Sequence, residues 1–148
     1  MTRLTDDEFV HMACCGIADA IALVRDLHTV CHLWDDIHDG DKPSGDQGMW
    51  AAMFDIPRNP FYQRHFATIQ PAMQMAALSW RVSEDMESGI VEERTIAHVT
   101  RHSLVEVFIL ISALCGGREH AIKTGPQWWA RNVRESLATF SNEMEVRA

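Results

Sequence analysis

The sequence predicts a single all-α domain over residues 1–148, folded as a five- or six-helix antiparallel bundle. Apolar residues recur at spacings of three and four along most of the chain, which is the period of a helix with one buried face. No stretch of useful length alternates with the two-residue period of a β-strand. The chain of 148 residues has the size of one domain, and such a domain buries roughly 70% of its unfolded surface. One hydrophobic core is therefore expected.

A long first helix is expected over residues 6–38. Thr5-Asp6-Asp7-Glu8 is a capping box, in which the Thr hydroxyl and the Glu carboxylate each accept a hydrogen bond from a backbone N–H group of the first turn. Apolar side chains then follow the helical period over residues 9–34. Gly40 and the prolines and glycines after it punctuate the chain, so the helix should end shortly before them.

Two further helices are expected in the middle of the chain. Ser44-Gly45-Asp46-Gln47 is a second capping-box pattern and favours a short helix that stops before Pro57. Asn59-Pro60 is typical of an N-cap followed by the first helical residue, because proline lacks a donor that this position would leave unpaired. We expect the helix that begins there to break or kink at Pro71 and to end at Ser88-Gly89.

An apolar helix is expected over residues 91–115, and after Leu104 it is apolar on nearly every side. A helix that is hydrophobic all round must be covered all round, so this helix and the first one should occupy the centre of the bundle. Gly116-Gly117 would cap it. A last amphipathic helix should follow Gly125-Pro126 and reach Met144.

The charge balance argues against nucleic acid and membranes as partners. Thirteen Lys and Arg against twenty-one Asp and Glu give a net charge of −8, which repels phosphate backbones and anionic lipids. The longest apolar run, over residues 104–115, is shorter than the ~20 residues that a membrane-crossing helix needs. The N-terminus is acidic, unlike a signal peptide. We expect a cytoplasmic protein with reduced, buried cysteines, because no zinc-ribbon spacing links them. They are Cys14, Cys15, Cys31 and Cys115.

The most suggestive chemical feature is the aspartate-rich end of the first helix. Helical spacing places Asp35 and Asp39 on one face with His28, while Asp36 lies on the neighbouring row with His32. Carboxylates at a helix C-terminus oppose the macrodipole, at a cost of about a few tenths of a kcal/mol each. A bound cation would offset this cost, and carboxylate oxygens suit Mg²⁺. The alternative interpretation is a plain solvated helix end.

The run HTVCHLWDDIHD, residues 28–39, resembles the first aspartate-rich motif, DDxxD, of the trans-isoprenyl diphosphate synthases. The resemblance covers this single motif, and Lys42-Pro43-Ser44 stands where that family carries paired arginines. It implies that Asp35 and Asp39 bind Mg²⁺ held to an allylic diphosphate, with Asp36 in support. His28 and His32 would then act nearby as acid–base groups or as groups behind the metal ligands.

A second candidate site lies on the apolar helix, where His98, His102 and Glu106 follow one another at i+4 steps. Two histidines at this spacing can share a transition metal, with a carboxylate one turn further as third ligand. The alternative is two partly exposed histidines. Glu106 lies within an apolar run, and a buried carboxylate costs several kcal/mol unless it is paired, protonated or metal-bound. If the first helix packs against this one, a single polar pocket is expected. Its members would be His28, His32, His98, His102 and Glu106.

Two functions therefore remain open. The favoured one is a small acidic helical binding or accessory protein without complete catalytic machinery, which forms a homo-oligomer or binds another protein. The neighbouring Trp128 and Trp129 support it, because both cannot share one helix face and one should lie at the surface or at a subunit contact. The alternative is a Mg-dependent enzyme acting on a diphosphate-bearing substrate. Glu84-Asp85-Met86-Glu87 supports that class, because it resembles the carboxylate pairs of all-α nucleoside triphosphate pyrophosphatases, although a solvated helix end also explains it.

Overall fold

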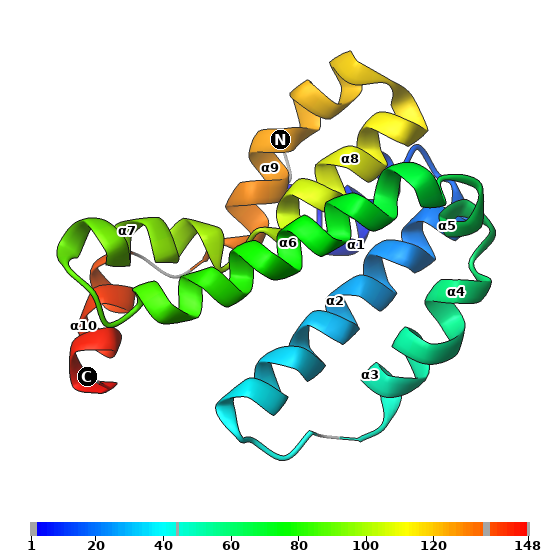
Figure 1. Cartoon of the computed structure of the whole chain (residues 1–148). Helices are drawn as coiled ribbons and strands as arrows, with labels where there is room; N and C mark the ends of the chain where they lie inside the picture. The colour runs from blue at the N-terminus through cyan, green and yellow to red at the C-terminus, as the bar shows by residue number, and fades with distance from the viewer. Residues whose placement is uncertain (1–2, 44, 135–136, 148) are drawn as a thin grey trace.

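The computed structural model describes residues 3–43, 45–134 and 137–147. Every regular element in these ranges is helical, which confirms the all-α class (Figure 1). In chain order the elements are α1 (Asp6–Ala13), α2 (Ala18–Asp39), α3 (Gln47–Trp50), the π-helical turn η1 (Ala51–Asp55), α4 (Ile56–Arg58), α5 (Pro60–Arg64), α6 (Phe66–Met86), α7 (Val91–Thr100), α8 (Leu104–Gly116), α9 (Arg118–Asn132) and α10 (Leu137–Arg147).

The antiparallel bundle that the sequence predicts is not confirmed, and the described residues form more than the five or six helices expected. In Figure 1, α6 runs across the molecule as a long spine, with α8, α9 and α1 near one end and α7 and α10 at the other. Helix α2 starts near α5, and α3 and η1 pack against it. The backbones of α2 and α6 stand apart, but side chains near the end of α2 meet α6, as in the Trp34–Trp80 and His38–Glu84 pairs.

The predicted first helix is in fact two helices. After Ala13 the chain turns, with Cys15 at φ 53° and Gly16 at φ 70° in the left-handed region. Glycine adopts this region freely, and a second left-handed residue beside it ends the helix. The apolar period continues across the turn because both helices face the same core, with Phe9 on one side and Val24 on the other both buried.

In the middle of the chain one predicted helix start is confirmed, and two prolines that were expected to end or break helices lie inside them instead. The side chain of Asn59 accepts a hydrogen bond from the Tyr62 backbone N–H at 3.0 Å, so it is the predicted cap of α5. Pro71 lies inside α6 without ending it, and the break falls at His65 instead. Pro57 likewise lies within α4. Ser44, which opens the second predicted capping box, lies outside the described residues.

The predicted apolar helix over residues 91–115 is divided into α7 and α8. Between them His102 and Ser103 donate backbone hydrogen bonds to carbonyls only three residues back, at 3.0 and 3.1 Å, a tighter turn than the α-helix. Helix α8 is central as expected, and Val105, Phe108 and Ile111 are buried in the main core. It ends at Gly117 with φ 91°. Helix α9 starts at once, rather than after Gly125-Pro126 as predicted.

One run in the described part of the chain, Val91–Gly116, is long and apolar enough to cross a bilayer, with a mean hydropathy of 1.5 in its best window. The criterion is met by length and composition alone, and the core helices of soluble proteins meet it too. Here the run bends between α7 and α8, and its second half packs against α9 and α6. It is weak evidence for a membrane.

Gly48 allows α3 to lie directly on α2. A Cβ atom at this position would lie 2.6 Å from the Cβ of Leu33, a buried residue of α2. We expect Gly48→Ala to lower the free energy of unfolding by about 1–2 kcal/mol, because overpacking outweighs the gain in helix propensity. Gly125→Ala is the matched control, since its Cβ would meet Ile109 at 3.7 Å, an ordinary contact. Urea denaturation followed by circular dichroism measures both, and equal stability of the two variants would contradict this packing.

Candidate functional site

The three predicted metal-binding aspartates lie in the last turns of α2, which ends at Gly40 with φ 75°. Asp35 and Asp36 are half-buried, while Asp39 is exposed. Burial raises the pKa of the Asp35 carboxyl, and the charge of Asp39 raises it further. Among the described residues, no group of three or more His, Cys, Asp or Glu side chains is arranged to hold a metal ion. The aspartates therefore crowd together without forming a recognisable cation cage.

Helix α6 adds a fourth carboxylate to this cluster. Glu84, whose side chain is 12% exposed, lies 3.0 Å from the His38 Nε2 atom of α2, a contact that is an ion pair only when the imidazole is protonated. Burial raises the pKa of Glu84, His38 lowers it, and Asp39 and Asp35 raise it, so these acids lie within electrostatic reach. The next residue, Asp85, is exposed and pairs with Arg81 at 3.8 Å. Two acidic patterns that are far apart in the sequence thus meet where the end of α2 lies beside the end of α6.

Neutralising Asp35 is expected to stabilise the fold. Its carboxylate is half-buried beside other acids and at the negative end of the α2 dipole, so charge removal relieves repulsion. We expect Asp35→Asn to raise the free energy of unfolding at pH 7 by roughly 0.5–1 kcal/mol. Asp41→Asn, an exposed position just beyond the helix, is the control. Thermal denaturation is the measurement, and a lower midpoint for Asp35→Asn would show that the ionised carboxylate stabilises the fold instead.

An apolar groove lies beside this acidic cluster, between α2 and α6. Its floor is a stacked pair of indoles, Trp34 and Trp80, with ring centroids 5.9 Å apart and an interplanar angle of 18°. The ring of His38 meets the face of Trp80 edge-on at 5.2 Å. The groove has a volume of about 640 Å³, and its walls include Ile37 and Leu78. The elements that position the acids thus also expose apolar side chains in this groove.

This surface extends well beyond the groove. Trp34, Ile37 and Leu78 are 51%, 56% and 61% exposed. On α6, Leu78 lies in a row with other apolar residues at helical spacing, and α3 with η1 displays four more exposed apolar side chains next to α2. We call these exposed residues of α2, α3, η1 and α6 the apolar face. Its members are Trp34, Ile37, Met49, Trp50, Met53, Phe54, Met75, Leu78 and Val82.

His28 and His32, the predicted acid–base groups, lie together on α2, with ring centroids 4.7 Å apart. The ring of His28 also lies 6.5 Å from that of Phe108 on α8. Burial lowers the pKa of His28, and the charges of His32 and Arg134 lower it further, so the imidazole is neutral at pH 7. His28 lines a separate cavity of about 640 Å³ between α1, α2, α8 and α9. It therefore faces away from the apolar groove.

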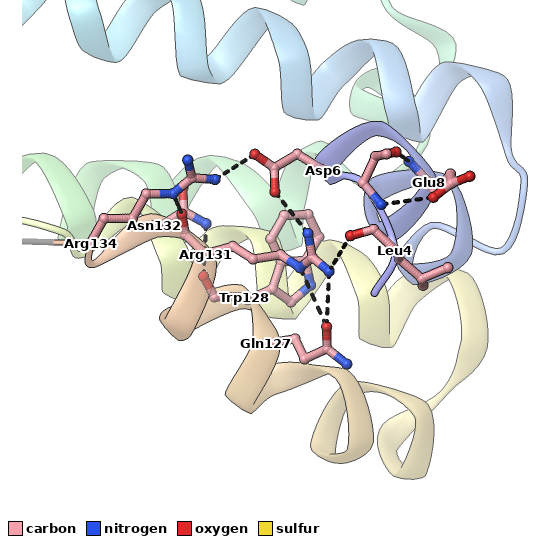
Figure 2. A network of polar contacts seen from close by, with 9 residues as sticks. Leu4, Asp6, Glu8, Gln127, Trp128, Arg131, Asn132 and Arg134 are labelled. Atoms are coloured by element: carbon pink, nitrogen blue, oxygen red, sulfur yellow. Dashed lines mark hydrogen bonds and ion pairs between the residues drawn. The ribbon is translucent and has the colours of Figure 1, made fainter. Parts of the chain in front are cut away.

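An arginine network forms another wall of that cavity (Figure 2). Arg131, only 7% exposed, donates hydrogen bonds to the Asp6 carboxylate at 2.8 Å and to the Leu4 carbonyl at 3.0 Å. Arg134 pairs with the other oxygen of Asp6, and these two arginines hold the pKa of the Asp6 carboxyl below its usual range. Sequence reasoning missed this network, because 125 residues separate Asp6 from Arg131 and no local pattern links them.

The expected site on the apolar helix does not form as predicted. His98 packs on Phe140 of α10 at 5.2 Å, within a small second core, and its ring centroid lies 6.5 Å from that of His102. Burial lowers the pKa of His102 to about 4, and Arg101 contributes. Glu106 is exposed rather than buried, so it needs no buried partner. The five residues predicted to share one pocket are split between separate places.

A comparison of the chain with protein-family models, curated proteins and solved structures finds no match. The resemblance of residues 28–39 to the isoprenyl diphosphate synthases therefore stays a prediction drawn from one motif. The geometry defines a class rather than a family: a helical protein with an acidic cluster, a separate arginine-walled cavity and an extended apolar face.

Proposed function

We propose that this chain is a small acidic helical accessory protein of the cytoplasm that self-associates through its apolar face. The single observation that carries the proposal is the gathering of exposed large apolar side chains on α2, α6 and the α3–η1 segment that packs against α2. Scattered apolar side chains are normal on a protein surface, but a continuous patch with a polar rim marks an interaction site. Here Trp34, Ile37 and Leu78, each more than half exposed, line one groove, and further exposed apolar residues lie on α6 and on α3 and η1, which pack against α2.

The rim of the groove favours a second copy as the occupant. Arg81 lines the groove and pairs with Asp85, so the rim carries both signs of charge. A copy related by a two-fold axis presents the same patch, and its arginine can face the acids of the first copy. The apolar centre supplies the affinity, since a fully buried Leu or Ile side chain contributes about 1.5–3 kcal/mol. Exposed ion pairs add less than about 1 kcal/mol each and serve mainly to fix how the two copies are oriented on each other.

Sedimentation velocity tests this proposal. As concentration rises through the micromolar range, we expect the mass to increase from 16.8 kDa toward twice that value. The association should persist at about 0.5 M salt, where exposed charges are screened over a few ångströms, because the contact is apolar. A mass of 16.8 kDa at every concentration would refute self-association, and dissociation by salt alone would refute the apolar contact.

A second candidate function, a Mg-dependent enzyme acting on a diphosphate-bearing substrate, is supported by one observation. Asp35, Asp39 and Glu84 come from two helices. Burial raises the pKa of Asp35 and of Glu84, and the neighbouring acids add to this, so a divalent cation near them would relieve repulsion. Titration calorimetry with Mg²⁺ and then with pyrophosphate tests it. A heat of binding in the wild type that is lost in Asp35→Ala would support this enzyme function. No heat of binding in either titration would refute it.

A further inference from the structure

The arginine-walled cavity between α1, α2, α8 and α9 has an aromatic base and a charged mouth. Its volume of about 640 Å³ lies within the range of ~300–1,000 Å³ that is usual for small-molecule sites. Phe9, Phe108 and Trp128 line it and are at most 2% exposed. The side chains of Arg25 and Arg134 also line it, and they are 61% and 66% exposed. The cavity therefore changes from charged groups at its mouth to aromatic carbon at its base.

The aromatic base is a cluster of rings in contact. The ring of Phe9 meets that of Trp128 edge-on, with centroids 4.9 Å apart, and the centroid of Phe108 lies 5.0 Å from that of Trp128. The ring of His28 continues the series along the wall, 6.5 Å from that of Phe108. The indole N–H of Trp128 already donates to the Ser112 hydroxyl at 2.9 Å. The base therefore offers aromatic carbon rather than hydrogen-bonding groups, and a further ring can extend it through offset or edge-on contacts.

The mouth carries more positive charge than its own acids neutralise. Arg131 and Arg134 each hold one oxygen of the Asp6 carboxylate (Figure 2), so two guanidinium groups meet one acid. The remaining pair, Arg25 with Asp7 at 3.5 Å, adds no net charge. Among the described residues that line the cavity, three arginines thus stand against two aspartates, a net charge of +1. In a chain of net charge −8, this mouth can attract an anion.

Arg134 is the group that can bind this anion. Arg131 is only 7% exposed, and its N–H groups donate to three residues, which are Asp6, Leu4 and Gln127. Arg134 donates through Nε to the Arg131 carbonyl at 2.7 Å and through one Nη atom to Asp6. Its other Nη atom donates to no residue in the described part of the chain. Arg131 therefore fixes the wall, while Arg134 keeps N–H groups for a ligand.

We propose that the arginine-walled cavity binds a small aromatic monocarboxylate, with the carboxylate on Arg134 and the ring against Phe108 and Trp128. A single negative charge matches the net charge of the mouth, and the ring fills the apolar base. A guanidinium donates charge-assisted hydrogen bonds to a carboxylate, which are stronger than neutral ones and fix the direction of the ligand. The cavity shares no lining residue with the groove between α2 and α6, so this binding does not depend on self-association.

Titration calorimetry of the full wild-type chain with phenylpropionate tests the proposal. We expect saturable binding of one molecule per chain, with a dissociation constant below about 1 mM. Phenylpropanamide has the same shape without the charge, and inorganic phosphate has charge without the ring. Each should bind at least ~10-fold more weakly than phenylpropionate, because each loses one of the two contacts. No saturable binding of phenylpropionate, equal binding of the amide or tighter binding of phosphate would overturn the proposal.

Nuclear magnetic resonance of the wild-type chain locates the bound molecule. On addition of phenylpropionate, the indole N–H signal of Trp128 and the imidazole signals of His28 should shift, because both side chains line the cavity. The indole signals of Trp34 and Trp80, in the groove between α2 and α6, should stay unchanged. Shifts confined to Trp34 and Trp80 would place the ligand in that groove and overturn the proposal. The spectra use the wild-type chain, so this outcome does not depend on the folding of a variant.

Arg134→Gln should weaken the binding of phenylpropionate by at least ~10-fold, because the charged donor is lost while Arg131 still holds Asp6. Arg118→Gln is the matched control. Arg118 is another exposed arginine, at the start of α9, where it pairs with Glu119 at 3.4 Å and lies outside the cavity. This control should bind phenylpropionate as the wild type does. Wild-type affinity in a folded Arg134→Gln variant, or equal weakening by the two substitutions, would overturn the proposal.

Discussion

Leu78→Glu is expected to weaken self-association by at least ~100-fold, because a carboxylate buried in an apolar contact without a partner costs several kcal/mol. Leu78 is the most exposed apolar residue of the groove, at 61%, and a glutamate there should leave the folded monomer intact. Sedimentation velocity at a concentration where the wild type is mostly dimeric should show a mass of 16.8 kDa for the variant.

Ile122→Glu provides a matched control for this experiment. Ile122 lies on α9, is 62% exposed and stands outside the apolar face. The two substitutions therefore add the same charge to equally exposed aliphatic side chains on different surfaces. We expect Ile122→Glu to associate as the wild type does. Equal weakening by the two variants would indicate that added charge, rather than the position of the contact, controls association.

Acidification from pH 6.5 to pH 4 is expected to destabilise the fold through its buried histidines. Burial and the charge of Arg101 lower the pKa of His102 from 6.5 to about 4, and His98 adds a smaller effect. Between these two pH values the unfolded chain binds a proton that the folded chain does not, so stability falls as pH falls. The shift corresponds to at most about 3 kcal/mol, and water that reaches the half-buried ring reduces this figure. Burial lowers the pKa of His28 and His98, which adds in the same direction.

His102→Gln should flatten this pH dependence, because the amide does not titrate. Exposed His11→Gln is the control and should leave the slope unchanged. Asp35 and Glu84 act in the opposite sense, since a raised carboxyl pKa favours the folded state as pH falls through it. Urea denaturation at pH 7, 5.5 and about 4.5 would measure the slopes. A wild-type slope that survives in His102→Gln would mean that other groups carry the acid sensitivity.

The parts of the fold that the sequence predicts correctly are those governed by local chemistry. Thr5 and Glu8 form the expected capping box, Asn59 caps α5, and the paired glycines end α8. The element boundaries that are wrong depend on tertiary contacts. The turn after Ala13 is hidden because the apolar period passes through it, and Pro71 lies within α6 between the buried residues Ile69 and Ala76.

The candidate sites show the same division. Helical spacing correctly places Asp35 and Asp39 together, yet nothing in the sequence brings Glu84 to them from α6. The apolar neighbours of Glu106 predict a buried carboxylate. One side of α8 is only half-buried, with Leu110 and Ala113 partly exposed, and the single carboxylate of the helix lies exposed on that side. Contacts between residues that are distant in the sequence, such as Arg131 with Asp6, produce no pattern of spacing from which they could be predicted.

Hydroxyl-radical footprinting of the wild-type chain at low and high concentration tests the central claim, that the apolar face is the surface covered by a second copy. Reactive Trp and Met side chains lie within that face, among them Trp34, Met53 and Met75. We predict that their oxidation falls as dimer forms, while Ile122 on α9 stays equally reactive. Unchanged oxidation of the apolar face at concentrations where the mass doubles, with protection elsewhere on the molecule, would contradict the account.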